Sequence, residues 1–176
     1  VIYLGTFSRA VAPAIRVSYM VLPEELLVRY RERCGFYACT VPRADQEVLT
    51  RFLEGGSFER HLNRMRGVYR EKKDRLLELL KPLEGDFRIQ GDEAGVHILI
   101  TSRRFTEEEL IRRAAGEGVR VYGLSRHYIE KKAAGASRTV LAGFARLGPE
   151  EMERGAKGLL KAWKTEAAGT GRRKRI

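Results

Sequence analysis

Residues 3–19 read YLGTFSRAVAPAIRVSY, two apolar runs separated by a loop that carries hydroxyl and arginine side chains. The apolar groups of residues 1–7 suit the end of a core strand, and residues 17–22 read as a second, continuously apolar strand. Residues 8–16, which include Pro13, are expected to form the connecting loop. Continuously apolar strands are typical of sheets covered on both faces, so this stretch predicts an α/β domain.

Three helices are expected after these strands. Pro23 opens the first, with carboxylates in its first turn, where they meet the positive end of the helix dipole. The second runs from about residue 44 to 53, and a Gly-Gly pair at 55–56 separates it from the longest helix, residues 57–80. Ser57 is the expected N-cap of that helix and Pro82 ends it. Its apolar residues recur at helical spacing: Leu62, Met65, Tyr69, Leu76 and Leu80.

A smaller α/β unit is expected in the remainder of the chain. Strands are predicted over 96–100, 119–122 and 139–144. Thr106 and Glu109 have the spacing of a capping box, which predicts a helix after the first strand. A last helix begins near Pro149 and carries an apolar stripe of Met152, Ala156, Leu159, Leu160 and Trp163. The order strand, helix, strand, strand, helix predicts a compact sheet with helices on a face.

Length and composition fit a globular chain. The 176 residues are 43% hydrophobic and 32% charged, and no apolar run of about 18 residues predicts a membrane span. The chain begins with Val1 and has no signal-peptide pattern, so we expect a cytoplasmic protein and the C-terminal portion of a longer one. Cys34 and Cys39 lack zinc-site spacing, and the three histidines are scattered, so no metal site is expected.

The net charge of +11, from 34 basic and 23 acidic residues, raises the hypothesis of a nucleic-acid partner. Most of the excess is dispersed over helix faces, but residues 172–175 read RRKR at the end of the chain. Such a tail is usually a solvated, disordered extension, and a specific contact with a polyanion is the alternative.

Residues 3–19 resemble the segment of class I/II aminotransferases that carries the lysine forming a Schiff base with pyridoxal phosphate. The family pattern runs Thr/Ser-Phe-Ser-Lys, three variable residues, Pro, two more residues, Arg, an apolar residue, Gly and Tyr. Here Thr6 and Ser8 match, Arg16 falls seven positions after the lysine position, and Arg9 occupies that position. Ser18 stands where the family has glycine.

The resemblance continues along roughly residues 1–164. Residues 52–69 look like the segment of MocR-type regulators that joins their large and small aminotransferase subdomains, and residues 94–100 resemble the glycine-led strand that opens the small one. Residues 118–122 and 141–147 are similar to later strands. We therefore identify the chain as the C-terminal part of a fold type I aminotransferase-like protein, in particular of the MocR-type GntR-family regulators. Those regulators fuse a winged helix-turn-helix to an aminotransferase-like domain.

This resemblance implies the fold class and the domains. We expect the end of a large subdomain that binds pyridoxal phosphate, followed by a complete small C-terminal α/β subdomain. Residues 1–23 would be the remnant of the large subdomain and residues 24–83 the connecting helices. Residues 84–165 would be the small subdomain, and residues 166–176 a basic disordered tail.

Arg9 bears on any covalent chemistry. A lysine amine can lose a proton and attack the aldehyde carbon of the cofactor. A guanidinium stays protonated in proteins and its charge is delocalised, so Arg9 is not expected to serve as nucleophile or base. It could hold a phosphate or carboxylate through a bidentate contact, or mark a decayed gene product.

The resemblance assigns the phosphate of the cofactor to Thr6, Ser8 and Arg16. A dianion needs a fixed cation and several donors, which these side chains supply. The alternative is that the hydroxyls bond loop backbone and Arg16 pairs with a nearby carboxylate. Arg138, just ahead of a predicted strand, is the candidate for the substrate carboxylate, with Arg126 and His127 as weaker candidates.

Three functions remain open from the sequence. The first is a fragment of an aminotransferase-like domain, for amino-group transfer or amine sensing, inactive because of Arg9. The second is the effector-sensing domain of a regulator that is a homodimer and reaches DNA only through a further N-terminal domain. The third is a basic nucleic-acid-binding module that uses the helix at 57–80 and residues 172–175, with affinity that falls steeply with salt.

Overall fold

The computed structural model describes residues 1–91, 95–129 and 137–164. The chain divides into two compact units, Val1–Arg66 and Gly67–Ile176. The boundary falls within the long helix α4 (Ser57–Leu80). The finer division at residues 23, 83 and 165 remains a prediction, and the basic tail expected at 166–176 lies outside the described residues.

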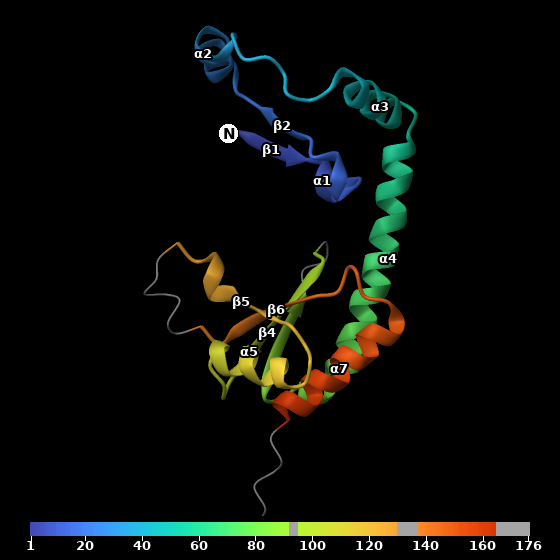
Figure 1. The fold of residues 1–176 in the computed structure, drawn as a ribbon, viewed down its shortest axis with the longest axis vertical. Helices are drawn as coiled ribbons and strands as arrows, with labels where there is room; N and C mark the ends of the chain where they lie inside the picture. Colours follow the sequence, from blue (N-terminus) through green and yellow to red (C-terminus); the bar gives the residue numbers. More distant parts are fainter. Residues whose placement is uncertain (92–94, 130–136, 165–176) are drawn as a thin grey trace, which may run out of the picture. The chain divides into compact units, whose positions relative to one another are not determined.

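The first unit begins with an antiparallel ribbon of β1 (Tyr3–Thr6) and β2 (Ser18–Val21), visible in blue in Figure 1. Thr6 lies opposite Ser18 at the closed end of the ribbon. The connection was predicted as a loop, but it contains the one-turn helix α1 (Phe7–Ala10) and the 3-10 turn η1 (Pro13–Ile15). Pro13 suits the start of that turn because its ring fixes φ near a helical value.

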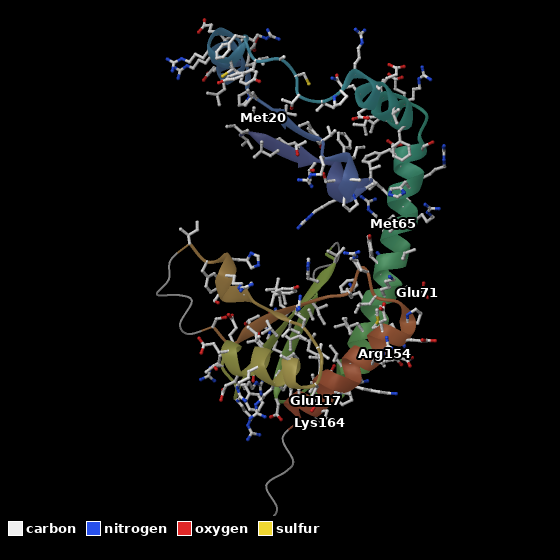
Figure 2. The ribbon with its side chains drawn as sticks, viewed as in Figure 1. Met20, Met65, Glu71, Glu117, Arg154 and Lys164 are labelled. Carbon is white, nitrogen blue, oxygen red and sulfur yellow. The ribbon has the colours of Figure 1, made fainter. Side chains whose placement is uncertain are left out.

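The ribbon corrects the expectation of buried core strands. All four residues of β2 are exposed within this unit, and Met20, labelled in Figure 2, is 48% exposed. Val17, directly before β2, is buried. A two-stranded ribbon buries little by itself, because stable burial needs a further layer packed on its face.

The helices of the first unit follow the sequence prediction. They are α2 (Glu24–Cys34), α3 (Arg43–Glu54) and the start of α4. Pro23 precedes α2, and Gly56 has a positive φ of 65° between α3 and α4, a conformation that glycine adopts without strain. The predicted bounds of α4, residues 57–80, are confirmed.

The second unit is a four-stranded antiparallel sheet in the order β3-β4-β6-β5, with helices packed on it (Figure 1). Its strands are β3 (Phe87–Gly91), β4 (His97–Ser102), β5 (Tyr122–Gly123) and β6 (Thr139–Gly143). Its helices and turns are η2 (Lys81–Leu83), α5 (Glu107–Gly116), η3 (Leu124–His127) and α7 (Pro149–Trp163).

The core lies between the sheet and the helices of this unit. Ile98 and Ile100 alternate with the more exposed His97 and Leu99 along β4, as the sequence predicted. Trp163 is buried at the end of α7, stacks on Phe87 with ring centroids 5.5 Å apart, and donates its indole N–H to Leu110 O at 3.1 Å. Other fully buried members are Leu80, Leu110, Val140 and Phe144.

Strand β3 was absent from the sequence prediction. Phe87 and Ile89 alternate with Arg88 and Gln90, but the run is too short for its period to stand out. The strand is fixed by pairing, with Phe87 opposite Ser102 and Gly91 opposite Ile98. Among the described helices, none has the length and apolar character needed to cross a bilayer.

Candidate functional site

The loop between β1 and β2 is closed by the side chain of Thr6. Its hydroxyl donates to Val17 O at 3.2 Å and accepts from the backbone N–H of Ser8 at 3.2 Å. The backbone N–H of Phe7 donates to the same Val17 oxygen at 2.9 Å. Thr6 therefore forms hydrogen bonds with the backbone of the loop. This is the alternative to a phosphate contact that the sequence left open.

Aromatic contacts hold this loop against the junction of α3 and α4. The Phe7 ring lies 5.4 Å from that of Tyr19 and 6.1 Å from that of Phe58, between centroids. Phe58 in turn meets Phe52 edge to face at 6.1 Å. A Cβ on Gly5 would lie 2.3 Å from the Tyr19 ring, so glycine is needed for that ring to cover the ribbon.

Arg16 has a backbone conformation that arginine seldom adopts. Its φ of 49° and ψ of 29° are left-handed, and it is the one non-glycine residue with positive φ among those described. A single residue in this region costs about 1–2 kcal/mol, and residues with such strained backbones cluster at functional sites. The Thr6 hydroxyl and the flanking ribbon hold the two ends of the loop that contains Arg16.

The two arginines of the loop are exposed and have no ion-pair partner among the described residues. Arg9 lies in the single turn of α1 and Arg16 directly after η1. The four ion pairs of the described chain involve neither of them. The alternative that Arg16 pairs with a nearby carboxylate is therefore not seen in this part of the chain.

These residues fit one end of pyridoxal phosphate. The Ser8 hydroxyl and the Arg16 guanidinium are donor types that a phosphate dianion needs, and both lie in the connection after β1. The Thr6 hydroxyl, at the end of β1, can join them only by giving up its bond to Val17 O. The aldehyde end does not fit covalent attachment, because Arg9 offers no amine that can lose its proton.

Arg138 lies in the second unit, immediately before β6, and its side chain is exposed. Its guanidinium Nη1 donates to the backbone oxygen of Arg103 at 2.7 Å. Its own carbonyl oxygen accepts from the N–H of Ser102 at 2.9 Å. The weaker candidates Arg126 and His127 form the exposed end of η3 in the same unit.

Glu107 is a buried charged residue that the sequence prediction missed. At 8% exposure, its carboxylate accepts from the N–H of Ser125 at 3.0 Å, from the Ser125 hydroxyl, and from the Ser137 hydroxyl at 2.6 Å. The sequence offered only a glutamate after the N-cap Thr106, and such a residue is usually a solvated first-turn carboxylate. No local pattern identifies its two serine partners, which are 18 and 30 residues away.

The carboxyl of Glu107 is ionised near neutral pH. Burial raises its pKa, but the hydrogen bonds from Ser125 and Ser137 outweigh that effect and hold the pKa below its ordinary value. Glu109, two residues further along the chain, also has a lowered pKa, but for a different reason. Its pKa is lowered mainly by the backbone N–H of Thr106, because it completes the predicted capping box.

Three grooves of the described chain lie away from these residues. One of about 880 Å³ in the second unit is lined by the stretch of α4 from Gly67 to Glu78 together with Leu147 and Pro149. None of the sequence-predicted site residues lines it. The candidate residues therefore lie in two separate places, the hydrogen-bonded loop of the first unit and Arg138 in the second, and not in these grooves.

The chain is similar to two groups of known proteins, transcriptional regulators and aminotransferases. It is 38% identical over 166 residues to a protein of Bacillus subtilis described as "Uncharacterized HTH-type transcriptional regulator YdeL", covering 93% of this chain and 35% of that protein. It is 29% identical over 168 residues to the Rhizobium meliloti protein described as "Probable rhizopine catabolism regulatory protein MocR", covering 93% of this chain and 33% of that protein.

Among solved structures, the chain resembles LysN, an α-aminoadipate aminotransferase of Thermus thermophilus crystallised with N-(5'-phosphopyridoxyl)-L-leucine. The TM-score is 0.75 at 27% identity, over 92% of this chain and 41% of LysN. No protein-family model matches the chain. The chain thus spans about a third of the length of the curated relatives that it matches.

Proposed function

Because this chain corresponds to the C-terminal part of a fold type I aminotransferase-like domain of the kind that MocR-type regulators contain, we propose that it belongs to an effector-sensing domain. In this proposal the domain holds pyridoxal phosphate without a covalent bond through position 9. The observation that supports it is that Arg9, which cannot condense with an aldehyde, lies near Thr6, Ser8 and Arg16, whose side chains are of the types that bind phosphate.

The phosphate end is held by Thr6, Ser8 and Arg16. The left-handed backbone of Arg16 supports this assignment, because backbone strain in a residue that packs little is explained by a ligand contact more readily than by folding. A guanidinium binds phosphate oxygens in pairs, which fixes orientation as well as charge.

Bound pyridoxal phosphate supplies an aldehyde and an electron-withdrawing ring to an amine ligand. This chain supplies no base at position 9 to move a proton from that ligand, since the guanidinium stays protonated. We therefore propose binding and signalling rather than turnover, with Arg138 as the residue that receives the carboxylate of an amino-acid effector.

The regulatory setting is likewise proposed from the relatives. A homodimer would cover apolar side chains that the first unit exposes, among them Leu4, Met20 and Val28. Contact with DNA would belong to a helix-turn-helix outside these 176 residues, as the descriptions of the relatives suggest, and such a regulator would act in the cytoplasm.

Three probes test the phosphate site on the isotope-labelled chain: pyridoxal phosphate, inorganic phosphate and pyridoxal. We expect the first two to shift the backbone amide signals of residues 6–16 and pyridoxal, which lacks the phosphate, to leave them in place. Arg16→Ala should abolish the response and Arg9→Ala should retain most of it. Equal responses to pyridoxal and pyridoxal phosphate would reject the phosphate assignment.

Borohydride reduction followed by mass mapping tests the covalent claim. The chain should give no pyridoxyl adduct at position 9, whereas Arg9→Lys should give one if the phosphate donors are in place. Mapping the adduct to a peptide separates position 9 from surface lysines. An adduct on Arg9 itself would contradict the proposal, and an unreactive Arg9→Lys variant would show that the loop no longer holds the cofactor.

A further inference from the structure

Glu107 joins two segments that are distant in the sequence. Its carboxylate binds Ser125 in η3 and Ser137 just before β6, and its own backbone N–H donates to Ser137 O at 3.2 Å. Ser137 is thereby held through both its hydroxyl and its carbonyl oxygen by one residue at the start of α5. The residue that follows Ser137 is Arg138.

Hydrogen bonds fix the backbone of Arg138 and of the residues on either side of it. Ser137 before it is bound by Glu107, and Thr139 after it shares a hydroxyl–hydroxyl bond of 2.9 Å with Thr101. The carbonyl oxygen of Arg138 accepts from Ser102 N–H at 2.9 Å. The backbone position of an exposed arginine is thus determined by buried or half-buried partners from two elements.

The acceptor of the Arg138 side chain is fixed as well. Arg103 O receives the guanidinium Nη1–H at 2.7 Å. The turn that presents this oxygen is tied by the Ser102 hydroxyl, 2% exposed, which accepts from the N–H groups of Arg104 at 3.1 Å and Phe105 at 2.9 Å. One of the five N–H donors of the guanidinium is committed to this contact, and the others remain on an exposed side chain.

The surroundings of Glu107 are built for its carboxylate. A Cβ on Gly123 would overlap the Glu107 carboxylate, so a larger residue there would displace the carboxylate from its present position. Burying a carboxylate is unfavourable unless hydrogen bonds replace its water, and here two serines replace it. A glutamate that served only the helix dipole would need none of these partners.

We propose that Glu107 is a positioning residue that orders Arg138, through Ser137, to bind the carboxylate group of the effector. This deepens the proposed function and rests on it. A long side chain that is already ordered loses less conformational entropy on binding, so the gain appears in ligand affinity. Glu107 itself touches no ligand in this scheme.

The test compares four variants of the chain. Glu107→Ala removes the carboxylate, and Ser137→Ala removes the hydrogen bond next to Arg138 together with the acceptor of the Thr139 N–H at 3.4 Å. Ser125→Ala removes the hydroxyl bond on the other side of Glu107. Glu109→Gln weakens the cap of the same helix without changing either serine. The readouts are the order parameter of the Arg138 Nε–H, measured by nitrogen relaxation, and the shift of that signal on titration with acetate.

Glu107→Ala and Ser137→Ala should each lower the order parameter and weaken acetate binding about two- to tenfold, the effect expected from freeing one long side chain. Ser125→Ala and Glu109→Gln should leave both readouts close to wild type. An unchanged Arg138 signal in a folded Glu107→Ala or Ser137→Ala chain would overturn the proposal, and so would the absence of any acetate shift in the wild type. If Glu107→Ala does not fold, the result for Ser137→Ala alone tests whether Arg138 is ordered through Ser137.

This result is separable from the test of the proposed function. The phosphate response of residues 6–16 lies in the first unit, whereas Glu107 and Arg138 lie in the second. Loss of the phosphate response with the expected Arg138 results would reject the cofactor proposal and keep the positioning role. If residues 6–16 respond to phosphate but the Arg138 signal is the same in the variants as in the wild type, the cofactor proposal stands and the positioning role of Glu107 is rejected.

Discussion

The hydroxyl of Thr6 donates to the carbonyl oxygen of Val17 at 3.2 Å, across the base of the loop that carries Arg9 and Arg16. A threonine hydroxyl has one proton to donate. To donate to a phosphate it must turn away from Val17, whose oxygen keeps its bond from the Phe7 N–H at 2.9 Å. Phosphate binding and the local order of this loop are therefore expected to be coupled through one side chain.

Replacing Thr6 tests this coupling. Thr6→Val keeps the shape but removes the acceptor of the Ser8 N–H, so the Ser8 amide should exchange with solvent faster. The expected loss is about 1 kcal/mol of local opening free energy, as for other capping side chains. Thr6→Ser, which keeps the hydroxyl, is the matched control. Equal Ser8 exchange in Thr6→Val and wild type, measured by NMR, would refute the capping role.

Two glycines three residues apart in α7 should respond to alanine in opposite ways. A Cβ on Gly155 meets nothing within 4 Å, so Gly155→Ala should stabilise the second unit by about 0.5–1 kcal/mol through helix propensity. A Cβ on Gly158 would lie 2.6 Å from Val119 Cγ2 and 3.2 Å from Glu117 O. Gly158→Ala should therefore destabilise it by about 1–3 kcal/mol.

The chain contains one tryptophan, and Trp163 is buried in the core of the second unit, so its fluorescence in urea follows the unfolding of that unit. Glu117, labelled in Figure 2, caps α5 and carries the backbone oxygen that Gly158 approaches. A double change of Gly158→Ala with Val119→Ala should recover part of the loss. Destabilisation by Gly155→Ala would show that α7 does not pack as described.

The stability of the second unit should depend on pH through Glu107. Because its pKa is lowered in the folded state, its carboxylate stabilises the fold above the unfolded-state pKa, and this contribution is lost as pH falls through the folded-state pKa. Glu107→Gln removes the titration. The difference in free energy of unfolding between wild type and Glu107→Gln should therefore be larger at about pH 6 than at about pH 3. A difference that grows on acidification would contradict the sign.

The sequence predicted those elements whose signals are local. The helix at Ser57–Leu80 has an apolar period over many turns, and the Thr106–Glu109 capping box sets the start of α5, so both were placed correctly. Strand β3 was missed because it is held by its pairing with β4 more than by its own five residues. The burial of β1 and β2 was predicted wrongly, since apolar residues indicate a face but not what covers it.

The candidate residues likewise fall into those that a local motif identifies and those that only the tertiary structure reveals. A short contiguous motif identified Thr6, Ser8, Arg9 and Arg16 as candidates. In the structure Thr6 ends β1 and the other three lie in the connection that follows. The left-handed conformation of Arg16 has no signal in its residue type, because arginine does not favour it. The sequence does not identify Glu107 as a candidate, because its role depends on Ser125 and Ser137, which only the tertiary structure brings close to it.

The two units should differ in protection from hydrogen exchange. Within the first unit only Val17 and Leu49 are buried apolar residues, whereas the second contains a continuous core around Ile98, Val140 and Trp163. Amide groups open by local unfolding where few apolar contacts resist it. We therefore expect the amides of β1 and β2 to exchange much faster than those of β4 and β6 in the isolated chain. Equal protection of the two sets in a monomer, verified by light scattering, would mean that the ribbon is stabilised by contacts other than those within its own unit.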